Sequence, residues 1–408
     1  MRDSAVTSPA SGATPNATRR IAPIRNTVLV TTMVSTAFQI FVISVLASVL
    51  LEDFDLSRFQ IGLIGSLNTA VGALTAPVSG RVTDRIGARR STIVAQLWTA
   101  CGFVVMANAN SVVVLIASAV ILGVPQGWGN PATNALIAER VPAGNRGVVT
   151  GIKQSGVQVG IFLAGVSLPT LADWIGWRGA MWAYAVLFGA FALIPLLLPR
   201  DPALENPPEA TDSTEPARPY DMRAVWLIAL YAFLMGTGGG AIGRFLALFA
   251  EEEAGLSTTA AGLVLALSGL AGIGVRILAG RLAEHRIEPL PLLAILASIG
   301  SIVAVLLLIT LQIGAWLLWP IALLFAVGHA AWNAVAMLAI ILGVDRSQAG
   351  RASGAVMFGF LGGLAVGAPI AGLVIDATDS YQPVWSGALV LAVASATVAR
   401  FAHRTART

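Results

Sequence analysis

The sequence predicts an all-α membrane protein in which twelve transmembrane helices form two pseudo-symmetric six-helix bundles. Of its 408 residues, 56% are hydrophobic and only 11% are charged, whereas about a quarter of the residues in a soluble domain are charged. Apolar runs of about 20 residues, the length that crosses a bilayer, recur along the chain. Polar positions also recur, because His329 and Asn333 follow Gln126 and Asn130 by 203 positions. This repetition favours a duplicated transmembrane unit.

Length and hydropathy place the twelve spans along the chain. The first apolar run is too long for the core of a signal peptide, so we expect it to be a retained helix. The two longest runs are expected to tilt in the bilayer or to extend beyond it. The predicted spans are residues 28–50, 60–79, 91–109, 111–138, 148–170, 179–198, 224–250, 258–280, 290–311, 314–343, 352–374 and 383–402.

Charged residues divide the connections between the spans into two alternating sets. The even-numbered connections carry arginines, such as Arg81 and Arg140, and the odd-numbered connections carry carboxylates, such as Glu52 and Asp376. Arginine collects on the cytoplasmic side of a membrane, so we expect a multi-pass protein of the cell's inner membrane with both termini in the cytoplasm. The formal net charge of +4 then reflects topology, and the expected partner is the lipid bilayer rather than nucleic acid.

The spans fall into two bundles joined by a linker. We expect a disordered cytoplasmic tail over residues 1–27, which are rich in Ser, Thr, Ala and Pro, and an N-terminal bundle over residues 28–198. Residues 199–222 are acidic and rich in proline, which is typical of a flexible cytoplasmic linker. A C-terminal bundle over residues 223–402 and a short cytoplasmic tail over residues 403–408 complete the chain.

Two titratable side chains inside the spans are candidates for substrate binding. A charge in hydrocarbon is costly, so it should face a cavity or a partner. Lys153 is the only lysine of the chain. It either faces the central cavity as a partner for an anion or extends to the membrane interface. His329 occupies the position equivalent to Gln126, which suggests a cavity position, and its alternative is a packing role.

Two arginines also fall within predicted spans. Arg244 follows the glycine-rich run 236–240, which favours a bend or a close helix approach. It is a candidate for substrate binding, and its alternative is an ion pair with the acidic loop 251–253. Arg276 lies nearer the cytoplasmic end of its span, and we expect it to be structural.

Amide and indole side chains in the same spans are candidates for orienting a small polar ligand beside these cations. Hydrogen bonding between helices is the alternative for each of them. The candidates are Gln39, Gln126, Trp128, Asn130, Asn134, Gln154, Gln158, Trp332 and Asn333.

Carboxylates are absent from the middle of every predicted span. A carrier of cations usually needs such a group, so the candidate cations favour an anionic or neutral substrate. Proton coupling would then use the substrate's own carboxylate or His329, a residue type that titrates near neutral pH. The sequence contains no nucleophile–base pair, metal-ligand cluster or cofactor loop. We therefore expect no enzyme activity, no cofactor and no metal site.

A short polar turn separates the second and third predicted spans, and it follows the pattern Gly-x-x-x-Asp-Arg-x-Gly-x-Arg-Arg. This pattern resembles the loop between helices 2 and 3 of the major facilitator superfamily. With twelve spans and a central linker, the resemblance extends over nearly the whole chain. Its residues are Gly80, Asp84, Arg85, Gly87, Arg89 and Arg90, with Gly280 and Glu284 in a weaker copy in the second half.

The resemblance implies alternating access by rocking of two six-helix bundles. It also implies that the turn residues form a cytoplasmic latch, in which Asp84 contacts a neighbouring helix end and Arg85, Arg89 and Arg90 support it. These residues would be conformational rather than substrate-binding.

The sequence departs from the proton-coupled drug exporters of that superfamily. Those exporters carry an arginine where this chain has Gly123 and a Gly-Pro pair where Ile161 follows Gly160. We therefore expect a monomeric secondary transporter that moves a small organic solute, an anion such as a carboxylate, across the inner membrane in symport with protons. A proton-coupled exporter of amphipathic, drug-like compounds is the alternative, and a preference for lipophilic cations would favour it.

Overall fold

Helices account for nearly all of the structure, a computed structural model that describes residues 15–142, 145–199, 222–343 and 346–407, and no strand occurs among them. The first half contains α1 (Pro15–Val45), α2 (Ala47–Phe54), α3 (Arg58–Ile86), α4 (Ala88–Ala107), α5 (Val112–Arg140), α6 (Arg146–Phe191) and η2 (Ile194–Leu197). The second half contains α7 (Met222–Glu252), α8 (Thr258–His285), α9 (Pro289–Ile313), η3 (Ala315–Leu317), α10 (Leu318–Ala330), α11 (Trp332–Gly343), α12 (Arg346–Thr378) and α13 (Gln382–Arg407).

The described residues contain enough long apolar helix for twelve membrane crossings. Eleven helical segments among them are long and apolar enough to span a bilayer. One of these, Val148–Leu197, has 50 residues, which corresponds to about 75 Å of helix and is far longer than one crossing needs. It turns at Gly176, where φ is 76° and ψ is 156°, so it contains the fifth and sixth spans. The predicted fold class and number of spans are confirmed.

The helices extend further than the predicted spans at both ends of the chain. α1 begins at Pro15 and α13 reaches Arg407, so helix replaces part of each predicted tail. Proline is favourable at the first position of a helix, and the last residues of α13 include neither glycine nor proline. Residues 1–14 and 200–221, which make up the rest of the N-terminal tail and nearly all of the predicted linker, lie outside the described residues.

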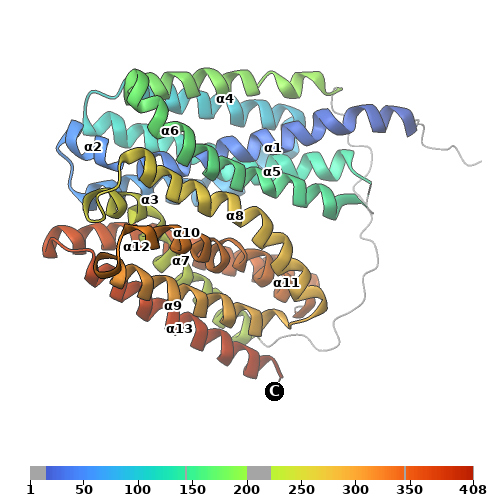
Figure 1. Ribbon diagram of the computed structural model, residues 1–408. Coiled ribbons are helices and arrows are strands. Elements are labelled where there is room, and N and C mark those ends of the chain that lie inside the picture. The colour runs from blue at the N-terminus through green and yellow to red at the C-terminus, as the bar shows by residue number, and fades with distance from the viewer. Residues whose placement is uncertain (1–14, 143–144, 200–221, 344–345, 408) are drawn as a thin grey trace, which may run out of the picture.

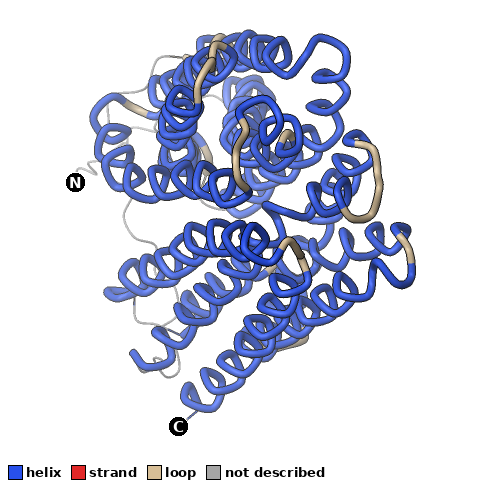
Figure 2. Tube along the Cα trace, turned by 90° about the vertical axis from the view of Figure 1, so that its left-hand side faces the viewer, coloured by secondary structure: helices blue, strands red, loops and turns tan. Residues whose placement is uncertain are grey.

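The helices form two bundles, α1–α6 and α7–α13 (Figure 1). A view at right angles shows the same two groups of helices, one above the other (Figure 2). The main contacts between the bundles come from two helix pairs, α3 with α12 and α6 with α8. Each pair joins one helix of the first half to one of the second, as expected for two related halves.

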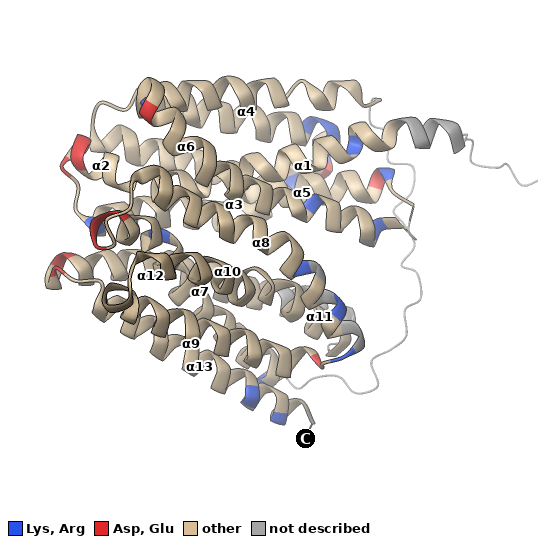
Figure 3. Ribbon diagram, viewed as in Figure 1, with Lys and Arg blue, Asp and Glu red and all other residues tan. Residues whose placement is uncertain are grey.

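Charged side chains gather at the two ends of the bundles (Figure 3). We call one end the basic end, which carries the α3–α4 turn with Arg85 and Arg89. The opposite end carries Glu52, Glu252 and Asp376, and we call it the acidic end. The helices between the two ends carry few charges (Figure 3), so the few charged groups found there are the candidates for function.

Candidate functional site

A cavity of about 260 Å³ lies between the two bundles. Helices α1, α3, α5 and α6 line it from one bundle, and α7, α8, α10 and α12 line it from the other. Four of the predicted candidates line this cavity: Gln126, Gln158, Arg244 and His329. Its polar side chains are Ser44, Thr69, Gln126, Gln158, Arg244, Ser268, Arg276 and His329.

Arg244 of α7 places a buried positive charge at the cavity wall. The residue is only 7% exposed and lies about 12 Å along α7 from the last residue of that helix, Glu252. Its Nη1 donates to the backbone oxygen of Ile40 at 3.4 Å, and its Nε has no hydrogen-bond partner among the described residues. The guanidinium packs against Gly65 of α3, where a Cβ atom would collide with it. Glycine at position 65 is therefore what allows Arg244 to lie between the bundles.

The predicted alternative, an ion pair between Arg244 and the loop 251–253, does not form. Glu251 instead accepts a hydrogen bond from Thr258 at 3.0 Å, and Glu252 pairs with Arg58 at 2.9 Å. The side chain of Arg244 turns towards the cavity, where these carboxylates do not reach.

Arg276 of α8 is a second cation of the cavity, although the sequence suggested only a structural role. Its Nε donates to the backbone oxygen of Ala330 at 2.8 Å. α10 ends at Ala330, and the last carbonyl groups of a helix are unpaired and partly negative, so they favour a cation. Beside this contact, the imidazole of His329 stacks on the Phe325 ring with 4.5 Å between centroids. No signal in the sequence separated Arg276 from an ordinary flanking arginine.

The cavity is electropositive. No aspartate or glutamate lines it among the described residues, and neither Arg244 nor Arg276 forms an ion pair with a described carboxylate. A guanidinium offers five N–H donors, and each of these arginines makes a single hydrogen bond. Buried charge is costly unless it is paired, so this arrangement suits an anion held between the two bundles.

Three other predicted site residues pack inside a single bundle. Gln39 is 2% exposed and accepts a hydrogen bond from Asn68 at 2.7 Å. Trp128 donates through Nε1 to Thr83 at 3.2 Å, and Trp332 packs against Phe360 with 4.4 Å between centroids. None of the following lines the cavity: Gln39, Trp128, Asn130, Gln154, Trp332 and Asn333.

Lys153 also lies away from the cavity. The residue is 1% exposed, and its Nζ donates to Oδ1 of Asn134 at 2.6 Å. The side chain therefore neither reaches the membrane interface nor faces the space between the bundles in this conformation. It makes a cross-helix hydrogen bond between α6 and α5.

We expect Lys153→Met to leave the affinity for a carboxylate within about twofold of the unchanged protein, because Nζ lies on Asn134 outside the cavity. Methionine has a similar length and removes a buried charge. Isothermal titration calorimetry on the purified variant measures the affinity, and a thermal melt reports on folding. Loss of binding in a well-folded variant would instead restore the substrate role suggested by the sequence.

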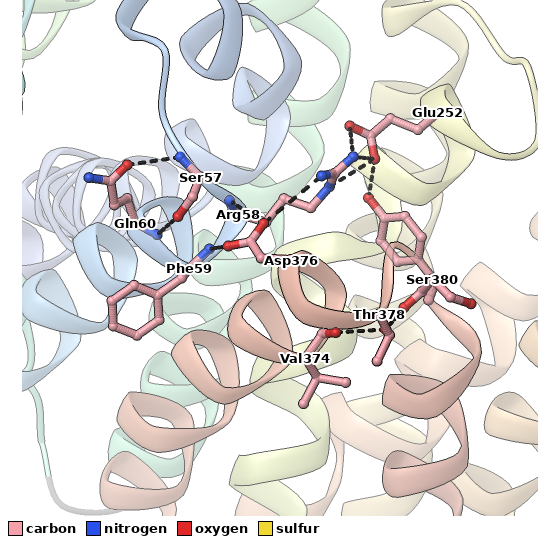
Figure 4. A network of polar contacts seen from close by, with 10 residues as sticks. Ser57, Arg58, Phe59, Gln60, Glu252, Val374, Asp376, Thr378 and Ser380 are labelled. Carbon is pink, nitrogen blue, oxygen red and sulfur yellow. Dashed lines mark hydrogen bonds and ion pairs between the residues drawn. The ribbon is translucent and has the colours of Figure 1, made fainter.

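The acidic end of the cavity is closed by contacts between the bundles (Figure 4). The carboxylate of Asp376 in α12 accepts hydrogen bonds from the backbone N–H groups of Arg58 at 3.0 Å and Phe59 at 2.8 Å. Ser57 and Gln60 form a capping box at the same helix start. A carboxylate is favourable at a helix N-terminus, where N–H groups are unpaired. Asp376 thus caps α3 from the opposite bundle.

The side chain of Arg58 strengthens this closure. It donates to both carboxylate oxygens of Glu252 in α7, at 3.0 and 2.9 Å. Tyr381 donates to the same carboxylate at 2.6 Å. Burial, together with Glu252, raises the pKa of Tyr381 and keeps the hydroxyl protonated. Between α8 and α6, Thr259 donates to Asp173 at 3.2 Å. Both pairs of helices that join the bundles are therefore tied at the acidic end.

Glycines show that the same helix pairs separate towards the basic end. Near the acidic end, Gly62 of α3 lies against the backbone of Ala368 in α12, and Gly165 of α6 lies against Gly262 of α8, with no room for a Cβ atom. Three glycines further along these helices face open space, with no described neighbouring atom within 4 Å of a Cβ position: Gly80, Gly151 and Gly354. The bundles are thus in contact at one end and apart at the other.

The polar turn between α3 and α4 stays within its own bundle. Gly87 has φ 83°, a conformation that glycine adopts without strain. Arg89 donates to the backbone oxygens of Pro195 at 2.9 Å and Leu196 at 3.0 Å.

The remaining turn residues do not reach another helix. Asp84, Arg85 and Arg90 are exposed, and Asp84 makes no hydrogen bond or ion pair with a described residue. Gly80 faces open space. Gly280 and Glu284 lie in α8, and their side-chain positions lie outside the described residues. The contact implied for Asp84 is not made among the described residues in this conformation.

Comparisons with known proteins agree with this architecture. A family model described as Major Facilitator Superfamily matches residues 28–368. Human monocarboxylate transporter 11 is 29% identical over 365 residues, which cover 84% of this chain and 75% of that protein. The gallate transporter of Pseudomonas putida is 30% identical over 168 residues, 39% of this chain and 35% of that protein.

The fold also matches solved structures. A bacterial homologue of the human lysosomal transporter Spinster, in an inward-facing and occupied conformation, superposes with a TM-score of 0.73 at 19% identity, covering 97% of this chain and 98% of that chain. At this identity the likeness concerns the fold alone. With the family match over most of its length, the chain belongs to the Major Facilitator Superfamily of multi-pass membrane transporters.

Proposed function

We propose that this transporter carries a small organic carboxylate across the membrane by alternating access, in symport with a proton. The observation that carries the proposal is the presence of Arg244 and Arg276 in one cavity that no described carboxylate lines. A guanidinium binds a carboxylate through charge-assisted and often bidentate hydrogen bonds. The names of two relatives, a monocarboxylate transporter and a gallate transporter, support an organic acid as substrate.

The charge distribution supports an orientation in the inner membrane. Arginines gather at the basic end (Figure 3), so the positive-inside rule puts that end and both termini in the cytoplasm. The bundles are tied at the acidic end and apart at the basic end, which corresponds to a state open to the cytoplasm. In the opposite state, we propose that Asp84, Arg85 and Arg90 engage the latch that the family resemblance implies. A single chain contains both bundles and the whole cavity, which supports a monomer.

His329 is the residue that we propose for proton coupling. It lines the cavity beside Arg276, its Nδ1 has no side-chain hydrogen-bond partner, and no described carboxylate of the cavity is available for the task. Imidazole is the side chain whose charge most readily changes near neutral pH. A proton on His329 would move with the bound anion and reduce the charge that crosses the membrane.

The test of this function uses the purified chain in proteoliposomes. Exchange of a labelled carboxylate, such as benzoate or propionate, against the same unlabelled compound measures carrier activity without a driving force. A pH gradient then tests coupling, because symport with a proton concentrates the carboxylate on the alkaline side more rapidly than permeation of the undissociated acid does in protein-free liposomes. Absence of exchange for every carboxylate offered would refute the proposal.

We expect His329→Gln to retain exchange and to lose accumulation driven by the pH gradient. Exchange needs no net movement of protons, whereas accumulation does. Glutamine is the residue at the equivalent position of the other half, Gln126, and it keeps polar atoms in the cavity. Gradient-driven accumulation that survives in this variant would exclude His329 as the coupling residue.

The exporter of amphipathic compounds remains the second candidate, because the cavity wall includes the rings of Phe41, Phe325 and Phe360. No described carboxylate lines the cavity, which argues against lipophilic cations as substrates because they need a negative partner. Thermal melts in the presence of carboxylates or lipophilic cations separate the two functions, since a ligand that binds the folded state raises its apparent stability. Stabilisation by cations alone would favour the exporter.

A further inference from the structure

The α7 side of the cavity is built from glycines, and one of them is not explained by packing. Gly239, Gly240 and Gly243 all line the cavity. A Cβ atom on Gly239 would collide with the ring of His329, and one on Gly240 would lie 3.1 Å from the backbone oxygen of Leu364. At Gly243, the nearest neighbour would be Cζ of Phe325 at 3.8 Å, which is an ordinary contact distance. The fold has room for a side chain at position 243.

The chain keeps glycine there against the preference of the helix. Glycine inside a helix is less favourable than alanine by about 1 kcal/mol. Elsewhere in α7, Gly236 lies against the backbone of Phe360, and a Cβ atom would not fit. No such backbone contact exists at Gly243. Its small size is therefore not needed for helix packing and instead enlarges the cavity.

That space adjoins a cation that has unused hydrogen-bond donors. Arg244, the next residue, lines the same cavity and is only 7% exposed. Its Nε atom has no hydrogen-bond partner among the described residues. A carboxylate on Arg244 would therefore place the rest of its molecule along the glycines of α7. Phe325 borders this space near Gly243, and the other apolar walls come from Phe41 and Phe360.

We infer that Gly243 is a specificity-determining residue, which admits a carboxylate with a ring-sized apolar body beside Arg244. This inference rests on the proposed function and narrows its substrate class. The cavity has a volume of about 260 Å³. A carboxylate of the size of benzoate fits within this volume, whereas acids of two or three carbons would leave most of the apolar wall without contacts.

The experiment measures binding of benzoate and propionate to the purified full-length chain by isothermal titration calorimetry. The unchanged protein is expected to bind benzoate at least about tenfold more tightly than propionate. Gly243→Ala is expected to weaken benzoate binding by about tenfold, because one methyl group in a fitted pocket changes affinity by about 10- to 200-fold. Propionate binding should stay within about twofold, since a short acid reaches Arg244 without filling the space.

Gly238→Ala is the matched control. Gly238 lies in the same helix and does not line the cavity, and its Cβ position is 3.8 Å from the nearest atom, Cβ of Leu391. Both alanine variants are expected to melt at or above the temperature of the unchanged protein, because alanine favours the helix. Only Gly243→Ala should alter benzoate binding.

The outcomes separate the inference from the proposed function. Propionate binding as tight as benzoate binding, or equal benzoate affinity in Gly243→Ala and Gly238→Ala, would overturn the inference and leave the carboxylate transporter in place. Binding of neither acid to the unchanged protein would overturn both. The comparison of the two acids in the unchanged protein remains decisive even if Gly243→Ala melts early.

Discussion

Arg244→Ala is expected to weaken carboxylate binding by about a hundredfold, because removal of one partner of a buried charge pair costs about 2–5 kcal/mol. Arg244→Lys should recover only part of this loss, since an ammonium cannot form the bidentate contact of a guanidinium. Without ligand, the alanine variant should melt at or above the temperature of the unchanged protein. The reason is that the substitution removes a buried charge whose Nε has no partner. Calorimetry and thermal melts measure both effects.

Arg25 provides a control of equal burial. It is also 7% exposed, but its guanidinium is occupied by hydrogen bonds to Asn26 and to the backbone oxygen of Arg140. Arg25→Ala should lower the melting temperature and leave carboxylate affinity unchanged. If Arg244→Ala behaved like Arg25→Ala, with lower stability and normal binding, the role of Arg244 would be structural.

Asp376→Ala is expected to favour separation of the bundles at the acidic end by about tenfold. The substitution removes the cap that α12 provides to the backbone of Arg58 and Phe59. Loss of such a cap costs about 1 kcal/mol, and loss of its charge at the helix N-terminus costs a further 0.3–1 kcal/mol or so. The ion pair with Arg58 is long, at 3.9 Å, and its side chains are 27% and 23% exposed, so solvent screens it and it adds little.

Pulsed electron paramagnetic resonance measures this separation directly. Spin labels on Asn110→Cys and Gln312→Cys, in a Cys101→Ser background, report the distance between exposed sites of the two bundles at the acidic end. Asp53→Ala is the matched control, since Asp53 also contacts two donors, Arg178 at 2.9 Å and Trp177 at 3.2 Å, but within one bundle. A longer-distance population should grow only in Asp376→Ala. Equal distance distributions in the two variants would show that Asp376 does not hold the bundles together.

The fold was predictable from the sequence because membrane solvation leaves few alternatives. A bilayer requires long apolar helices, and the duplicated positions Gln126 and His329 already implied two related halves. Both residues line the central cavity. The limits of the helices were less predictable, because helical hydrogen bonding continues past the apolar segment wherever no residue stops it. α1, for example, begins at Pro15, well before the first apolar run.

The cavity residues were harder to predict because hydropathy does not report which way a side chain points. Lys153 and Arg276 look alike in sequence, as single cations near the cytoplasmic ends of apolar runs. Packing separates them: Nζ of Lys153 meets Asn134 inside one bundle, whereas Arg276 meets the carbonyl that ends α10 at the cavity wall. The break between α10 and α11 that provides this carbonyl has no proline or glycine at its centre, Ala331, so no local signal marked it.

The open glycines at the basic end have a consequence for how this transporter tolerates change. In the alternating-access cycle proposed above, the helix pairs that are apart at Gly80, Gly151 and Gly354 must approach each other when that end closes. A side chain at one of these positions would be harmless in the state described here and would act as a wedge in the other. Such a change would lower the transport rate without altering the residues that bind the substrate. The small size of these residues therefore serves the conformational change between the two states. Selection on transport rate can act at these positions independently of selection on substrate specificity.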